Sequence, residues 1–171
     1  MMNIDFRLAE SKEDFLQGRS LFEIYAKTLG IDLAFQGFNA ELENIATHYA
    51  KPSGALFLAL NEGMAIACAA LRPLEDKTAE LKRMFVLPTY RSHHIGRKLL
   101  FLCLNHAAIC GYKFLRLDTL PQMDRAQSLY RSVGFYEIEA YRFNPVPGTR
   151  FMELNLGDIT RDDLWSAPPH T

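Results

Sequence analysis

The sequence lacks an excess of either charge: 19 Lys and Arg residues are balanced by 20 Asp and Glu residues, a formal net charge of -1 over 171 residues. This balance gives no bulk electrostatic reason to expect nucleic acid or an anionic membrane as a partner. Long apolar runs are also missing. The longest, Met64 to Leu71, is far too short to cross a bilayer, and acids occupy the N-terminal region where a signal peptide would be apolar. We therefore expect a cytoplasmic protein.

Cysteine is scarce, and its spacing matches no metal site. Cys68, Cys103 and Cys110 form an odd set, which argues against a disulfide framework. Cys103 and Cys110 lie seven residues apart in a predicted helix, hence on one face, and we interpret both as small buried side chains; the alternative is a redox role. The adjacent His93 and His94 point apart and have no ligand partner three or four positions away, so we predict no metal.

Hydrophobic periodicity and turn residues divide the chain into strand, two helices, three strands, helix, strand, helix and two strands. The predicted ranges are 4–8 (strand), 11–30 and 39–49 (helices), 55–60, 64–71 and 79–87 (strands), 95–110 (helix), 113–119 (strand), 123–133 (helix), 135–138 and 150–156 (strands). Short turns between the three central strands indicate an antiparallel meander. We predict an α/β (mixed α+β) fold, with a mostly antiparallel sheet flanked by helices on both faces. Residues 1–157 form one predicted domain, and residues 158–171 a polar C-terminal tail.

The segment 79–97, AELKRMFVLPTYRSHHIGR, carries the strongest functional signal. A strand ends at a proline, a short basic loop follows, and a helix begins near Gly96. Backbone N–H groups and the positive end of the helix dipole then point at one place, which favours an anion. Arg91, Arg97 and Lys98 add charged donors for phosphate, and Gly96 lets a ligand approach the backbone closely. The alternative is an ordinary strand, loop and helix with solvated basic residues.

Two motifs, Arg91-Ser92-His93-His94-Ile95-Gly96 and the stretch from Ala126 to Phe135, stand one helix and one strand apart. Together they resemble the GNAT superfamily of acetyl-CoA-dependent N-acetyltransferases. The first is similar to the family's pyrophosphate loop, Gln/Arg-x-x-Gly-x-Gly/Ala, at its first and last positions. His94 stands where the family usually has glycine, and a positive φ there would be costly for His. The second matches all five named positions of the family's late helix, Ala-x-x-Leu-Tyr-x-x-x-Gly-Phe.

The resemblance covers about residues 64–135 and implies a GNAT-like fold with acetyl-CoA as cofactor. It implies transfer of the acetyl group to a primary amine of a small-molecule or peptide acceptor, by direct attack in a ternary complex. The alternatives are a non-catalytic protein of the same fold that binds or senses acyl-CoA, and a transferase for a longer acyl group. Where the family often has Asn three residues before Ala126, this chain has Met123, so that cofactor contact is absent.

The resemblance also implies a donor site. Backbone amides along the strand from Met84 to Val86 would meet the pantetheine arm and the acetyl carbonyl, while the side chains pack in the core. Tyr130 would protonate the departing thiolate, or else it is a half-buried tyrosine packing on the sheet. The expected cofactor-binding residues are Met84, Phe85, Val86, Arg91, Ser92, His94, Ile95, Gly96, Arg97, Lys98 and Thr119.

Glu80 matches the strand position where some family members carry a general base, and there it would accept the proton of the amine, directly or through water. Lys82 lies two residues on, hence on the same strand face. Two other readings stay open. The two residues form a surface ion pair of little energetic value, or Lys82 keeps Glu80 ionised so that it orients the substrate.

The acceptor site is expected to involve Asp32, Phe35, Arg72 and Asp118. Asp118 would attract a cationic amine, or it caps a strand-end turn. Arg72 would bind a carboxylate of the acceptor, or it pairs with Glu75. Asp32 and Phe35 would line a pocket wall, or else they pack under the helices. The apolar residues Phe143 and Val146 make a homodimer a further prediction.

Overall fold

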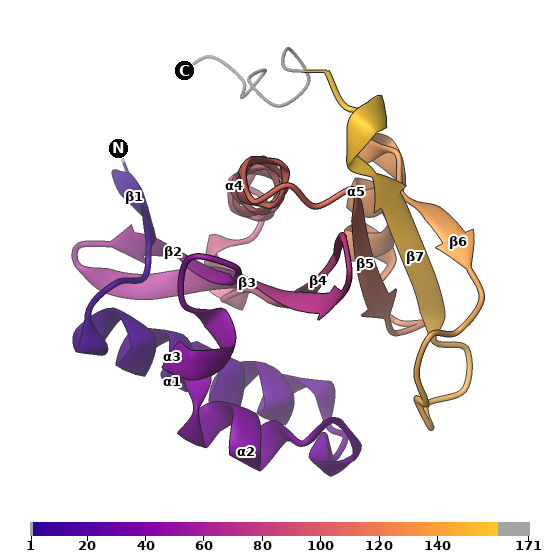
Figure 1. Cartoon of the computed structure of the whole chain (residues 1–171). Helices are drawn as coiled ribbons and strands as arrows, with labels where there is room; N and C mark the ends of the chain where they lie inside the picture. The colour runs from indigo at the N-terminus through magenta and orange to yellow at the C-terminus, as the bar shows by residue number, and fades with distance from the viewer. Residues whose placement is uncertain (1, 161–171) are drawn as a thin grey trace.

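The computed structural model describes residues 2–160, which form one seven-stranded sheet with helices on both faces (Figure 1). The strand order is β1-β2-β3-β4-β5-β7-β6, and β4–β5 is the parallel pair in an otherwise antiparallel sheet. The strands are β1 (Ile4–Leu8), β2 (Ala55–Asn61), β3 (Met64–Glu75), β4 (Thr78–Val86), β5 (Phe114–Thr119), β6 (Tyr136–Ile138) and β7 (Arg150–Asn155). The predicted fold class is confirmed. Residues 161–171 of the predicted tail lie outside the described residues.

The helices form two layers, with α1 (Lys12–Leu29), α2 (Phe38–Glu43) and α3 (Ile45–Tyr49) below the sheet in Figure 1 and α4 (Ile95–Ile109) above it. Helix α5 (Asp124–Val133) lies beside β5 and β7. Short 3₁₀ turns complete the order: η1 (Ala34–Gln36), η2 (Pro88–Tyr90) and η3 (Leu156–Asp158). None of the described helices combines the length and the apolar character that a membrane span requires.

Local sequence signals explain where α1 begins and ends. Ser11 accepts a hydrogen bond from the Asp14 backbone N–H, and the Asp14 carboxylate accepts from the Ser11 N–H, a capping box. Gly30 ends the helix at φ 65°, a left-handed conformation that glycine adopts without strain. The single helix predicted over 39–49 is wrong: it is divided at Asn44, whose φ of -120° is not helical and whose side-chain amide donates to the Ala40 carbonyl.

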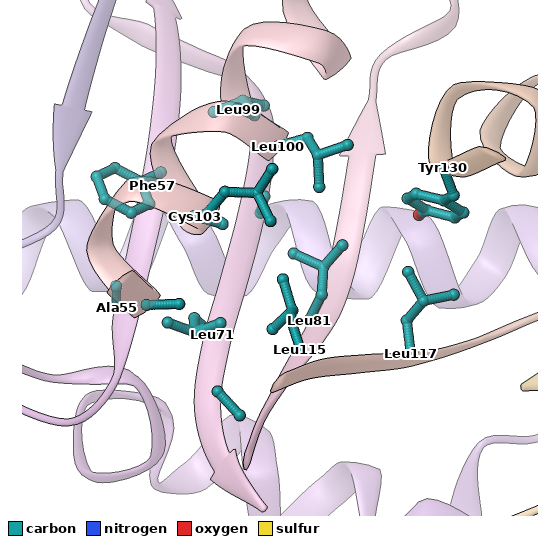
Figure 2. Close-up of a cluster of buried hydrophobic side chains, with 14 of the residues drawn as sticks. Ala55, Phe57, Leu71, Leu81, Leu99, Leu100, Cys103, Leu115, Leu117 and Tyr130 are labelled. Carbon is teal, nitrogen blue, oxygen red and sulfur yellow. The ribbon is translucent and has the colours of Figure 1, made fainter. Parts of the chain in front are cut away.

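Each helix layer covers its own hydrophobic core. The α4 side holds Leu99, Leu100 and Cys103, fully buried against leucines of the sheet (Figure 2). The prediction that both helical cysteines are buried is right for Cys103 and wrong for Cys110. Helix α4 ends at Ile109, so Cys110 leaves the buried face and is exposed.

Exposed apolar side chains in the described residues include Phe143, which is 77% exposed, in the connection between β6 and β7. Val146 in the same connection is only partly exposed. The homodimer therefore stays a prediction.

Candidate active site

The sheet opens between β4 and β5. Backbone pairing joins these strands only from Thr78 to Glu80 on β4 and from Phe114 to Arg116 on β5, although β4 runs on to Val86 and β5 to Thr119. Beyond this short parallel ladder the two strands diverge. Main-chain groups on the distal half of β4 therefore face a gap rather than a neighbouring strand. An extended ligand can bind along such an edge.

A bulge in β4 marks the same point. The register between β3 and β4 shifts between Cys68 and Ala70, and Arg83 adopts a φ of 55°. Positive φ is costly for a side chain of this size, and bulges commonly redirect a strand beside an active site. The bulge separates Lys82 from Met84 and so turns the end of β4 toward the gap.

A groove of about 910 Å³ follows this gap from β4 across the start of α4 to α5. Nine of the eleven expected cofactor-binding residues line it: Met84, Phe85, Val86, Arg91, Ser92, His94, Ile95, Gly96 and Arg97. Lys98 does not, because its ammonium lies 4.3 Å from the centre of the Phe6 ring. Thr119 lines an inner cavity instead, where its hydroxyl donates to the Met123 sulfur over 3.8 Å.

The start of α4 suits a phosphate. His94 occupies the N-cap position at φ 56°, its side chain makes no capping hydrogen bond, and no acid stands in the first turn. The first backbone N–H groups of a helix have no partner within the helix, so here they are available to an anion. A Cβ built on Gly96 would meet no atom closer than Val86 Cγ2 at 3.8 Å, so the groove side of this residue is open. The residues present therefore fit the pyrophosphate of a coenzyme A group.

The groove's basic side chains are held by local contacts. Arg91 Nε donates to the Val86 carbonyl over 3.2 Å, and the Arg97 guanidinium lies 5.0 Å from the centre of the Phe101 ring. Arg125 on α5 adds a third cation that sequence reasoning missed. The feature of the sequence that could have identified Arg125 is its position directly before Ala126, the first residue of the second motif.

The costly backbone conformation considered for His94 is present. Ser92 also has a positive φ, 76°, so two of the four loop residues between η2 and α4 are left-handed. Such conformations persist where the surrounding structure over-determines them, and they cluster at ligand sites. His94 thus adopts in this chain the conformation that a glycine would adopt without strain.

An inner cavity of about 60 Å³ lies at the deep end of the groove. Four residues line both hollows, so the two lie side by side: Tyr25, Met84, Met123 and Ala126. The cavity wall comes from α1, η1, β4, β5, α5 and the connection after β6. Its polar lining residues are Tyr25, Gln36, Lys82, Arg83, Asp118, Thr119, Tyr130 and Asn144.

Tyr130 lies in this cavity, 6% exposed, and packs edge-on against the hydrophobic core (Figure 2). Burial, reinforced by the neighbouring Tyr25 and Asp118, raises the pKa of Tyr130 far above its ordinary value. Burial likewise raises the pKa of Tyr25 to about 12. Both phenols therefore keep their protons at neutral pH and can only donate to an incoming negative charge.

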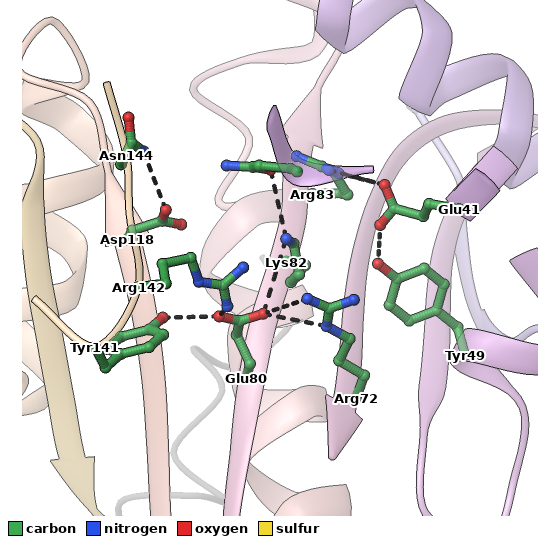
Figure 3. Close-up of polar contacts among 11 residues, drawn as sticks. Glu41, Tyr49, Arg72, Glu80, Lys82, Arg83, Asp118, Tyr141, Arg142 and Asn144 are labelled. Carbon is green, nitrogen blue, oxygen red and sulfur yellow. Dashed lines mark hydrogen bonds and ion pairs between the residues drawn. The ribbon is translucent and has the colours of Figure 1, made fainter. Parts of the chain in front are cut away.

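Glu80 is fully buried and surrounded by donors (Figure 3). Its Oε1 atom lies 3.2 Å from both Arg72 Nε and Nη2 and 3.8 Å from Lys82 Nζ. Its Oε2 atom accepts a hydrogen bond of 2.8 Å from the Tyr141 hydroxyl and pairs with Arg142. The surface-pair reading of Glu80 and Lys82 is wrong, because both side chains are buried. The two remaining readings, a general base and an ionised carboxylate that orients the substrate, stay predictions.

Lys82 connects this cluster to the cavity. Its ammonium donates to Gln36 Oε1 over 3.4 Å, and its side chain lines the cavity. Burial and the charges of Arg83 and Arg72 lower the pKa of Lys82 to about 7. On its other side, Arg83 donates through two nitrogens to Glu41 Oε2, over 3.1 and 2.8 Å.

The predicted acceptor residues separate into two groups. Phe35 and Asp118 line the cavity, where Asp118 accepts a hydrogen bond of 3.2 Å from the Asn144 amide. Asp32 does not line it; its carboxylate accepts from the Ala34 backbone N–H. Arg72 pairs with Glu80 rather than with Glu75, since the Glu75 carboxylate is bound by Arg116.

Sequence reasoning missed the residues that long-range folding adds: Tyr25 from α1, the buried Arg83–Glu41 pair, and Tyr141 with Arg142 after β6. The sequence signal for the charged members of this set was their position inside apolar segments. Such a signal does not identify the residue with which each of them pairs.

Comparisons with known proteins agree with this geometry. Residues 19–135 match the Acetyltransferase (GNAT) family. An uncharacterised N-acetyltransferase of Schizosaccharomyces pombe is 32% identical over 156 residues, which cover 90% of this chain and 96% of that protein. The N-acetylaspartate synthetase of Xenopus tropicalis is 31% identical over 141 residues, 78% of this chain and 49% of that protein. A GNAT acetyltransferase structure from Staphylococcus aureus superposes with a TM-score of 0.75 at 26% identity, covering 90% of this chain and 99% of that one. The chain belongs to the GNAT family of acetyltransferases.

Proposed function

We propose that this protein transfers the acetyl group of acetyl-CoA to a primary amine by direct attack within a ternary complex. The observation that supports this best is that the two hollows share four lining residues at the gap between β4 and β5. A long donor fits the groove, a small acceptor fits the cavity, and they meet beside Met84 and Tyr25. Such an arrangement brings both reactants together without a covalent enzyme intermediate.

In this proposal the groove binds the donor. The N–H groups at the start of α4, with Arg91, Arg97 and Arg125, bind the pyrophosphate, and the open edge of β4 near Met84 lies along the pantetheine arm. When bound, acetyl-CoA would supply a thioester carbonyl carbon for attack by the neutral amine: a C–N bond forms, the C–S bond breaks, and the nitrogen releases one proton to water, which balances the proton that the thiolate receives.

Tyr130 is the proposed general acid. Its phenol is protonated at neutral pH and reaches the cavity where the two hollows meet, so it can donate a proton to the departing thiolate. Glu80 contacts only donors and lines neither hollow, which supports a positioning role rather than proton abstraction. Asp118 lines the cavity and is proposed to attract the cationic form of the amine.

The test combines binding with turnover. Calorimetry should give a micromolar dissociation constant for acetyl-CoA, about -8 kcal/mol. A thiol-reactive dye should then report release of CoA that depends on an added amine. Binding without release for any amine would favour the alternative, a non-catalytic protein that binds or senses acyl-CoA. Absence of binding at millimolar acetyl-CoA would overturn the proposal.

A further inference from the structure

The ion-pair cluster beside the cavity contains more positive than negative charge, and Lys82 is the member of it that lines the cavity. Three cations, Arg72, Lys82 and Arg142, converge on the single carboxylate of Glu80. Their side chains are 23%, 3% and 19% exposed, so water screens them poorly. Buried charges of one sign in such excess are costly unless an anion compensates them.

The neighbouring ion pair does not supply that anion. Arg83 is already matched by Glu41, whose second oxygen accepts from the Tyr49 hydroxyl. Asp118 lines the opposite wall of the cavity on β5 and is bound by Asn144 (Figure 3). Among the described residues, the three cations around Glu80 therefore share one carboxylate.

Arg142 also has an unused hydrogen-bond donor. Its Nε atom is buried and has no hydrogen-bond partner among the described residues. Burial and the adjacent charge of Arg72 lower the pKa of Arg142 to about 10, as expected where positive charge is in excess. Arg142 does not itself line the cavity; it is connected to the cavity through Glu80, whose carboxylate also contacts Lys82 on the cavity wall. A buried guanidinium with an unused N–H suits a carboxylate.

We infer that the acetyl acceptor is a small amino acid whose carboxylate binds Lys82 and Arg142, while its amine faces Asp118. This inference rests on the proposed function and names the substrate class of that same site. A volume of about 60 Å³ admits only a small group beyond the groove, which excludes large multi-ring amines from this end. The charges on the two walls match a zwitterion: positive on β4, negative on β5.

The first test measures binding without transfer. Succinate carries carboxylates but no amine, and succinamide has the same shape without charge. Calorimetry on the full chain with CoA present should show succinate binding at least tenfold more tightly than succinamide. Arg142→Met should weaken succinate at least tenfold, with Arg142→Lys intermediate. Arg150→Met removes an exposed arginine that pairs with Glu137 and should change binding less than twofold. Equal binding of the two probes, or equal effects of the two methionine variants, would overturn the inference.

The second test measures turnover. Release of CoA is followed with small α-amino acids and with their carboxamides, which keep the amine and lose the carboxylate. The acids should have kcat/KM values at least tenfold higher, and Arg142→Met should abolish that preference. Efficient transfer to amides and simple amines alike would sink the inference but leave the proposed function standing. Charge-dependent succinate binding with no transfer to any amine would support the anion site and contradict the acetyltransferase assignment of the cavity.

Discussion

The outer groove and the inner cavity are built in different ways. Most of the groove comes from one stretch of chain, the end of β4, the loop after it and the start of α4, completed by α5. The cavity takes side chains from six segments that the fold brings together, and its polar groups are buried or half-buried. In the proposed function the groove binds the donor largely through main-chain N–H groups, whereas the cavity binds the acceptor through particular side chains. Substitutions should therefore separate donor binding from acceptor use.

The largest effect is expected at Glu80. Glu80→Gln leaves Arg72, Lys82 and Arg142 without their shared carboxylate, and breaking a buried ion pair costs about 3–5 kcal/mol. Urea unfolding should show a loss of this order, while calorimetry at low temperature should show acetyl-CoA affinity within twofold of wild type. The matched change Glu75→Gln removes an exposed partner of Arg116 and should cost about 0.5 kcal/mol or less. Equal losses of unfolding free energy in the two variants would mean that the buried ion pairs of Glu80 stabilise the protein no more than an exposed pair does.

The next largest effect concerns Tyr130. Tyr130→Phe removes the proposed proton donor and should lower kcat about 100-fold, since a general acid contributes roughly that much or more. Acetyl-CoA affinity should stay within twofold, because the hydroxyl lines the cavity and not the groove. Tyr112→Phe, whose hydroxyl donates to the Ser53 carbonyl, serves as control and should keep wild-type turnover. Undiminished release of thiolate by Tyr130→Phe would remove the acid role.

Gly96→Ala should affect the groove alone. The new methyl group finds room next to Val86, and alanine is the better helix former by up to about 1 kcal/mol, so the protein should be as stable or more stable. The same methyl group stands where the ligand approaches the backbone, and we expect acetyl-CoA affinity to fall about tenfold by calorimetry. Ser128→Ala on the exposed side of α5 is the control. Unchanged affinity would mean that the ligand does not approach this residue.

The smallest effect is a pH dependence that originates in the cavity. The pKa of Lys82 is about 7 in the folded protein, below its ordinary value of 10.5. Between these values the unfolded chain holds a proton that the folded protein has lost, so stability rises with pH across this window. The charged groups that surround Lys82 are Glu41, Arg72, Glu80, Arg83 and Asp118.

Comparing variants isolates this contribution. From pH 7 to 9 the unfolding free energy of wild type should rise by about 1–2 kcal/mol relative to Lys82→Met. Lys113→Met, at an exposed position, should follow the wild-type profile. Parallel profiles for wild type and Lys82→Met would show that this lysine is charged across the whole range.

Local sequence patterns correctly predicted the features that depend on residues close together in the chain. Nine of eleven expected cofactor-binding residues line the groove, because a strand, a loop and a helix start in sequence order also meet in space. Lys98 does not line the groove, for a tertiary reason: its ammonium packs over the Phe6 ring of β1. Half of the acceptor prediction, Phe35 and Asp118, lies in the cavity, while Asp32 is used by a local turn. The general-acid role of Tyr130 and the role of Glu80 stay predictions.

The sequence by itself determined the fold class, the two family motifs and the prediction of an anion site at the start of α4, because these follow from periodicity, capping and helix geometry within short segments. Only the tertiary structure decided that Glu80 is buried among three cations, that one of these is Arg142 from the connection between β6 and β7, and that Tyr25 lines both hollows. Polar partners and burial depend on contacts between residues that are far apart in the sequence. Tyr141 and Glu80, which form a hydrogen bond, are separated by 61 positions. No local rule assigns such partners, since a charged residue pairs with whichever group the packing of the sheet brings within reach.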